Sequence, residues 1–128
     1  MTLPVSARVE AAPNFLSNLE VARLFLIEQD KDSATERFRK LKAELREMIT
    51  VLGWSPGSGR PASFLAGRSV QARLRVEAVQ QLAAQVGLPY LREYIINRHV
   101  VLYAYSETEV VLLALKHQRQ LAYSAEGW

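Results

Sequence analysis

The last third of the chain contains the pattern that most restricts its possible folds. β-branched and aromatic residues fill three runs, Tyr90–Ile96, His99–Tyr105 and Glu109–Lys116. The connections between them, residues 97–98 and 106–108, have the length of hairpin turns. Such runs are typical of antiparallel strands, so we predict a three-stranded β-meander. The last run is apolar on both faces, which indicates a central strand that is covered from both sides.

The first half of the chain predicts a strand followed by two helices. Residues 4–11 alternate between apolar and polar side chains, and this period of two indicates a short strand. Pro13 suits the first turn of a helix that runs to about Glu28. A capping-box pattern beginning at Ser33 opens the second helix, and Gly53 is expected to end it. The apolar stripes of the two helices comprise Phe15, Leu19, Ala22 and Leu26, widened by Val21 and Phe25, and then Phe38, Leu41, Leu45, Met48 and Leu52.

The chain between the second helix and the meander divides into a loop and a third helix. Prolines and glycines are so dense in residues 54–61 that regular structure is not expected there. Residues 68–86 show a helical apolar pattern that stops at Gly87. Its stripe comprises Val76, Val79, Ala83 and Val86. We expect this helix, within an insertion at about residues 62–89, to cover the second face of the sheet.

Together these elements predict one α+β domain over residues 1–128. A chain of 128 residues with 49% hydrophobic residues fits a single core. The N-terminal strand is expected to pair with a meander strand, which gives a four-stranded sheet with helices packed on it. The chain has no cysteine, and no apolar run approaches the ~20 residues that span a bilayer. We therefore expect a cytoplasmic protein.

The usual motifs for cofactors, metals and hydrolysis are not found in the sequence. Gly57-Ser58-Gly59 is followed by Arg-Pro rather than by a capped helix, so a phosphate-binding loop is not expected. The two histidines, His99 and His117, have no carboxylate near them at ligand spacing. No serine has the context of a nucleophile elbow. We expect neither a metal nor a cofactor.

Two groups of basic residues occur in the meander, one at its first hairpin and one at the exit of its last strand. Their members are Arg92, Arg98, His99, Lys116, His117 and Arg119. Antiparallel pairing places His99 near the end of the last strand, so the two groups are expected to share one edge of the sheet. Arginine and lysine there can contact phosphate or acidic side chains, and histidine can exchange a proton near neutral pH. The simpler interpretation is solubilising charge at strand ends.

Two tyrosines of the middle strand allow two interpretations. Tyr103 and Tyr105 alternate with apolar residues. Exposed tyrosines on a sheet can stack on nucleic-acid bases. Since tyrosines in such alternation more often pack under a helix, we predict that these two are packed.

The meander residues also resemble a known family. Leu91–Tyr94, Arg98–Tyr103 and Val110–Arg119 resemble the C-terminal half of the RelE/ParE superfamily, the toxins of bacterial type II toxin–antitoxin (plasmid stabilization) modules. Gly59-Arg60-Pro61 is similar to the loop that the family places before its sheet, and the order of strand, helical hairpin and meander matches. The resemblance implies a growth inhibitor that a cognate antitoxin neutralises by folding a segment over the helices and the sheet.

The family divides into two mechanisms, and the resemblance offers site residues for each. RelE-type members cleave mRNA in the ribosomal A site with basic residues and a C-terminal tyrosine or histidine, whereas ParE-type members inhibit DNA gyrase. A RelE-like catalytic site in this chain would comprise His99, Lys116, His117, Arg119 and Tyr123. The residues expected to bind a partner protein are Arg92, Arg98, Lys116 and Arg119.

Three residues depart from the RelE pattern and favour the ParE-like mechanism. Leu91 and Glu93 occupy positions at which RelE-type nucleases carry lysines, and Val100 lies near the position of an arginine. An acid there would oppose the cationic stabilisation that phosphate cleavage needs. A RelE-like endoribonuclease acting on ribosome and mRNA, and a degenerate non-toxic member, are the alternatives. The helix at 68–86 is a further departure, and a homodimer or antitoxin surface is an alternative role for it.

Overall fold

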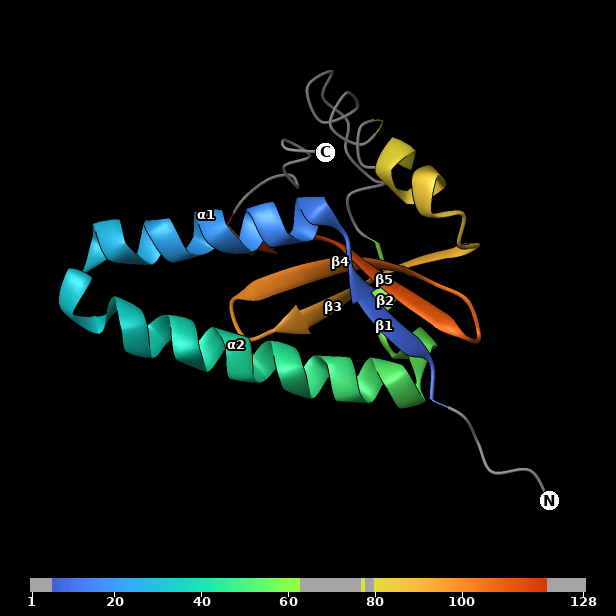
Figure 1. Ribbon diagram of the computed structural model, residues 1–128, viewed down its shortest axis with the longest axis horizontal. Helices are drawn as coiled ribbons and strands as arrows, with labels where there is room; N and C mark the ends of the chain where they lie inside the picture. The colour runs from blue at the N-terminus through green and yellow to red at the C-terminus, as the bar shows by residue number, and fades with distance from the viewer. Residues whose placement is uncertain (1–5, 63–76, 78–79, 120–128) are drawn as a thin grey trace.

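The computed structural model describes residues 6–62, 77 and 80–119, which form a mixed five-stranded sheet with a helical hairpin on one face (Figure 1). The elements are β1 (Arg8–Ala11), α1 (Pro13–Gln29), α2 (Lys31–Trp54), the 3₁₀ turn η1 (Pro56–Ser58), β2 (Arg60–Pro61), β3 (Tyr90–Ile96), β4 (His99–Tyr105) and β5 (Glu109–His117). Residues 80–86 are also helical. The strand order in the sheet is β1-β5-β4-β3-β2. The predicted α+β class, N-terminal strand and helical hairpin are confirmed.

The predicted four-stranded sheet is wrong by one strand. β3, β4 and β5 are antiparallel neighbours, and β1 pairs parallel with β5. The fifth strand, β2, lies in the segment that was expected to be loop, and it pairs with β3 through Arg60 opposite Glu93 and Pro61 opposite Arg92. Proline has no backbone N–H, and Pro61 is tolerated because β2 is an edge strand with no further strand on its outer side that would need that donor.

The main core lies between the helical hairpin and the near face of the sheet. Phe15 of α1 is buried there, together with the predicted stripe of α2 from Leu41 to Leu52, and Phe38 packs against the edge of this cluster. The strands contribute Ile96, Val101, Tyr103, Val110, Leu112 and Leu115. Burial of Tyr103 confirms that this tyrosine packs under the hairpin.

A β-bulge in β5 decides which of its residues face which side of the sheet. Leu102 of β4 pairs with Ala114, but the next residue, Tyr103, pairs with Leu112, so Leu113 is the extra residue. Leu113 and Ala114 therefore both belong to the core on the second face, whereas Leu112 and Leu115 face the hairpin. Bulges shift the alternation of a strand in this way.

The second face of the sheet has a smaller core. Leu82 is buried there, among strand residues that include Val100, Leu102 and Ala104. Gly87 ends the helical residues 80–86 with a φ of 68°, the left-handed conformation that glycine adopts readily. The prediction that the third helix covers this face is confirmed for residues 80–86. Of the rest of the predicted helix at 68–86, only Glu77 belongs to the described residues.

Two asparagines of α1 replace strand pairing along the outer edge of β5. β1 pairs with β5 only as far as Leu112. Beyond that point the Asn14 amide donates to the carbonyl oxygen of Leu113 at 3.0 Å, and the Leu115 N–H donates to the Asn18 side-chain oxygen at 2.9 Å. Both asparagines are buried. A buried backbone group needs a partner, and here α1 supplies side-chain partners where the strand has stopped.

Several predicted details of the helices are wrong. α2 begins earlier than the Ser33 capping box, because Asp30 is the N-cap and its carboxylate accepts from the N–H of Asp32 at 3.1 Å. Gly53 lies inside α2, where its carbonyl accepts from the N–H of Ala7, and the helix ends at Trp54. In α1, Val21 and Phe25 are exposed rather than part of the core stripe.

Candidate functional site

The strand register gathers most of the predicted basic residues at one end of the sheet. His99 at the start of β4 lies directly opposite His117 at the end of β5, as the topology predicted. The N–H of Gln118 donates to the carbonyl of Arg98 at 2.8 Å, which holds the chain after β5 against the β3–β4 turn. Arg98 and Arg119 are exposed at this end. We refer to Arg98, His99, Lys116, His117 and Arg119 as the basic end.

The two faces of the sheet divide the basic end. His99 and His117 lie on the hairpin side, the side of Val101 and Leu115, and their rings meet edge to face with centroids 5.4 Å apart. Lys116 is paired with Val100, which belongs to the core of the second face. The lysine and the histidines therefore point to opposite sides of the sheet.

Both histidines are held in the neutral form near pH 7. Burial lowers the pKa of His99 to about 4, and His117 adds to this effect. Burial also lowers the pKa of His117, with further contributions from Arg119, Arg98 and Lys116. The N–H of Arg119 donates to Nδ1 of His117 at 3.1 Å, so that nitrogen carries no proton. A neutral imidazole can accept a proton and so act as a general base, but its remaining N–H is too weakly acidic to act as a general acid.

A buried acidic residue lies on the second face of the sheet. Glu93 of β3 is fully buried, and its carboxylate lies 3.7 Å from Nε of Arg60. Burial lowers the pKa of Lys116, while Glu93 raises it and Arg60 lowers it, so charges on β2 and β3 act on the lysine of β5. The sequence showed Glu93 only as a departure from a basic pattern. Its partnership with Arg60 depends on the β2–β3 register, which short-range patterns do not reveal.

Arg92 is separated from the basic end. It lies toward the other end of β3, where its guanidinium donates to Tyr105 Oη and to the Gly59 carbonyl, both at 3.1 Å. Tyr103 anchors the same loop, because its hydroxyl donates to the Pro56 carbonyl at 2.7 Å and accepts from the Gly59 N–H at 2.9 Å. Arg92 thus has a structural role in holding the loop before β2. Tyr123 lies outside the described residues.

Glycine at position 59 is required by this close approach. A Cβ there would collide with the carbonyl oxygen of Glu93 and would lie 2.7 Å from Tyr103 Oη. The loop therefore seats directly on β3 and β4, and a shallow hollow of about 280 Å³ opens beside it. Its lining comprises Ser58, Gly59, Arg60, Glu93, Tyr94 and Ile95. The hollow lies next to the Arg60–Glu93 pair and not at the histidines.

No family model and no curated protein matches the chain. Within residues 6–62, 77 and 80–119, no helix is both long and apolar enough to cross a membrane. In the same part of the chain, histidine and acidic side chains do not form a group of three that could hold a metal ion.

Proposed function

We propose that this protein is the toxin component of a bacterial type II toxin–antitoxin (plasmid stabilization) module, a ParE-like member of the RelE/ParE superfamily that inhibits growth by binding DNA gyrase. The meander residues that resemble the family, and the order of strand, helical hairpin and meander, support membership. A cognate antitoxin would neutralise it. The observation that favours gyrase over mRNA is the division of the basic end between two faces of the sheet.

A nuclease needs its acid, base and cations to converge on one phosphate group. Here the neutral histidines lie on the hairpin side, and Lys116 lies on the other side, where the charge of buried Glu93 raises its pKa. A histidine with a pKa of about 4 is not charged at neutral pH, so His99 does not serve as a general acid or as a cation. This arrangement is unfavourable for cleavage of a phosphodiester.

The exposed arginines of the basic end suit a contact with an acidic protein surface. Arg98 and Arg119 are exposed, and both lie close enough to His117 to lower its pKa. Guanidinium groups pair with carboxylates through two parallel hydrogen bonds, which favours a specific contact. We therefore assign the target contact to Arg98 and Arg119. We leave out Arg92, because its guanidinium donates to Tyr105 and to the Gly59 carbonyl, and Lys116, because it is half-buried on the second face of the sheet.

The test is a supercoiling assay with purified gyrase and the purified chain. The proposal expects loss of supercoiling as the chain is added, and restored supercoiling when its cognate antitoxin is also present. Unchanged supercoiling at all concentrations, together with harmless overexpression in a bacterial host, would support a degenerate member and contradict the proposal.

One observation favours the second candidate, a RelE-like endoribonuclease. His99, His117, Arg98 and Arg119 lie together, and a neutral imidazole can act as a general base. This candidate predicts ribosome-dependent mRNA cleavage that Arg119→Ala and His117→Ala abolish without unfolding the protein. A chain that inhibits gyrase and leaves mRNA intact excludes it.

A further inference from the structure

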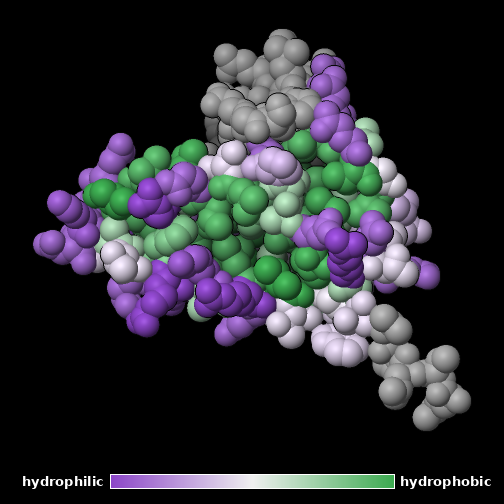
Figure 2. Space-filling model, in the orientation of Figure 1, coloured by the Kyte–Doolittle hydropathy of each residue, from purple (hydrophilic) through white to green (hydrophobic). Residues whose placement is uncertain are grey.

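The outer side of α1 is apolar, although helices of this kind usually expose charged residues. Four large apolar side chains are about half exposed or more on it: Leu16 (54%), Val21 (64%), Leu24 (48%) and Phe25 (52%). They form two neighbouring rows at a spacing of four residues, Leu16–Glu20–Leu24 and Ser17–Val21–Phe25. Residues four apart lie one turn apart on the same face, so the rows make a continuous surface. Figure 2 shows hydrophobic residues reaching the surface along this helix.

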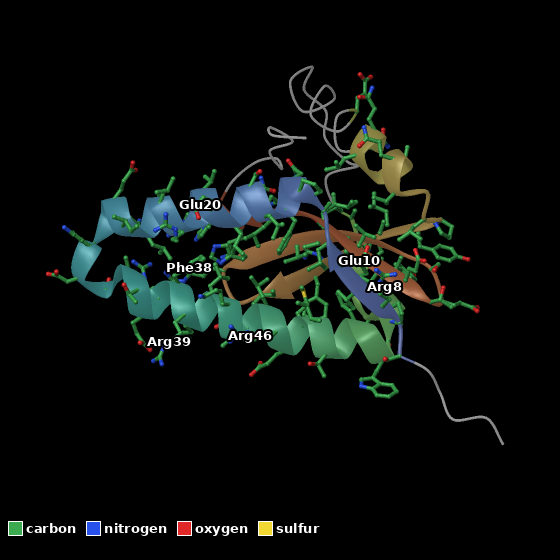
Figure 3. The ribbon with its side chains drawn as sticks, viewed as in Figure 1. Arg8, Glu10, Glu20, Phe38, Arg39 and Arg46 are labelled. Atoms are coloured by element: carbon green, nitrogen blue, oxygen red, sulfur yellow. The ribbon has the colours of Figure 1, made fainter. Side chains whose placement is uncertain are left out.

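Between residues 16 and 25 this surface carries one acid and one base, and the next charge along the row, exposed Glu28, lies one turn beyond Leu24. Glu20 lies between Leu16 and Leu24, and its carboxylate accepts from the guanidinium of Arg23 at distances down to 2.5 Å. Both side chains remain about half exposed, at 55% and 41%. Figure 3 shows Glu20 on α1, whereas Arg39 and Arg46 lie on α2, the other helix of the hairpin. A strongly acidic or basic partner would gain little from a surface that carries one charge of each sign.

Because Glu20 and Arg23 pair within the chain, the surface between Leu16 and Phe25 carries no net charge and can meet a second copy of itself without repulsion. We infer that the outer side of α1 binds α1 of a second copy of this chain, in an antiparallel pair about a two-fold axis between Glu20 and Val21. That axis places Ser17 opposite Leu24 of the second copy at the centre of the interface, with Leu16 and Phe25 on its two flanks. Glu20 then lies within about one turn of Arg23 of the second copy. Contacts of this isologous kind are the commonest in symmetric dimers.

The packing expected of this pair follows from its two rows. Rows at a spacing of four residues form ridges that interdigitate when two helices cross at about 50°. An interface confined to one helix buries less than the ~800 Å² per partner of a standard stable complex. The dimer is therefore reversible, and it dissociates on dilution. The inference does not rest on the proposed target, because it uses only the surface of α1.

Sedimentation equilibrium of the purified full chain, from about 1 µM to about 500 µM, tests the inference. The wild-type chain is expected to shift from monomer to dimer within this range. Val21→Arg should raise the dissociation constant at least about tenfold, since it places a charge at the centre of the interface. Val51→Arg is the matched control, because Val51 is an exposed valine on α2, and it should leave the dissociation constant unchanged.

Charge exchange gives a second, independent readout. Glu20→Arg and Arg23→Glu should each weaken the dimer, and the double variant should restore it toward the wild-type dissociation constant. A wild-type chain that remains monomeric throughout the range overturns the inference. So does a Val21→Arg variant, folded by circular dichroism, that dimerises like the wild type or no more weakly than Val51→Arg. A monomer would leave the gyrase proposal untouched.

Discussion

The two helices of the hairpin use their faces in opposite ways. α2 buries leucines and a methionine against the sheet, and most of its outer face is charged, with exposed Glu36, Arg39, Lys40, Arg46 and Glu47. α1 buries Asn14 and Asn18 and exposes leucine, valine and phenylalanine. The difference follows from what each helix covers. α2 packs on the apolar residues of one face of the sheet, whereas α1 also lies along the edge of β5, where backbone groups need hydrogen-bond partners.

This comparison separates two uses of apolar residues. On α2 they stabilise the chain's own core, and their spacing identifies the buried face. On α1 they are divided between the core, through Phe15, and an outer surface that we assign to a second copy. Substitution of an apolar residue should therefore affect folding on one helix and association on the other.

The largest effect is expected for inward leucines of α2. Leu45→Ala removes a buried side chain from the main core and should lower the free energy of unfolding by about 2–5 kcal/mol. Leu24→Ala on α1 is the matched variant and should change it by no more than about 0.5 kcal/mol. Urea titration at low protein concentration measures both. Similar losses in the two variants would contradict the contrast between the helices.

The next effect concerns the asparagines that α1 buries. Asn14→Leu introduces an apolar side chain of similar size and removes the donor to the buried Leu113 carbonyl, so it should cost about 1–3 kcal/mol of stability. Ser17→Ala, on the outer side of the same helix, should change stability by less than about 0.5 kcal/mol. If Asn14→Leu proved as stable as the wild type, the asparagines would not be needed at the strand edge.

A pH effect of similar or smaller size should come from His99, beneath the hairpin side of the sheet. Its pKa of about 4 in the folded chain lies below the unfolded value of about 6.5. Stability is then complete above pH 6.5 and falls as the pH drops toward 4, because only the unfolded chain binds the proton in that range. We expect a loss of about 2 kcal/mol, discounted for partial exposure.

The His99→Gln variant isolates this effect from the titration of carboxylates. Its stability relative to the wild type should improve steadily as the pH falls from 6.5 to 4. Proton NMR titration of the wild type should show the His99 imidazole neutral at pH 5.5. If the His99 imidazole titrates near pH 6.5 in the folded chain, its pKa is not lowered and the expected loss of stability does not occur.

The smallest effect is expected at the junction of the two helices. Asp30→Ala removes the side-chain cap of α2 and should cost about 1 kcal/mol. Ser33→Ala should cost less, since Ser33 lies inside the helix and only donates to Asp30 at 3.0 Å. Thermal unfolding of the two variants distinguishes the observed cap from the capping box that the sequence suggested. The reverse order would contradict the observed helix start.

The sequence predicted the meander, β1 and the inward face of α2 because each depends on residues close together in the chain. The assignment of Val21 and Phe25 to the core was wrong, since helical periodicity cannot tell an inner apolar face from an outer one. The bulge at Leu113 was not foreseen, because apolar residues filled β5 on both sides and concealed the change of alternation. That change decides the side on which Lys116 lies.

The sequence predicted which residues form the candidate site, but not how their side chains are arranged. Antiparallel topology was enough to bring His99 and His117 together. The separation of Arg92 from them, and the burial of Glu93 beside Arg60, depend on long-range register and on the loop held by Tyr103. Such contacts join residues more than thirty positions apart, and no local pattern specifies them.

The central functional claim is that Arg98 and Arg119 contact a protein target and do not serve phosphate cleavage. The most direct test compares the concentration needed for half-inhibition of gyrase supercoiling by the wild-type chain and by Arg98→Glu/Arg119→Glu. The double variant should need at least about tenfold more protein, because opposed charges are replaced by like charges in the contact. The exposed α2 variant Arg39→Glu/Arg46→Glu should match the wild type. Equal inhibition by the wild type and the Arg98→Glu/Arg119→Glu variant would contradict the claim.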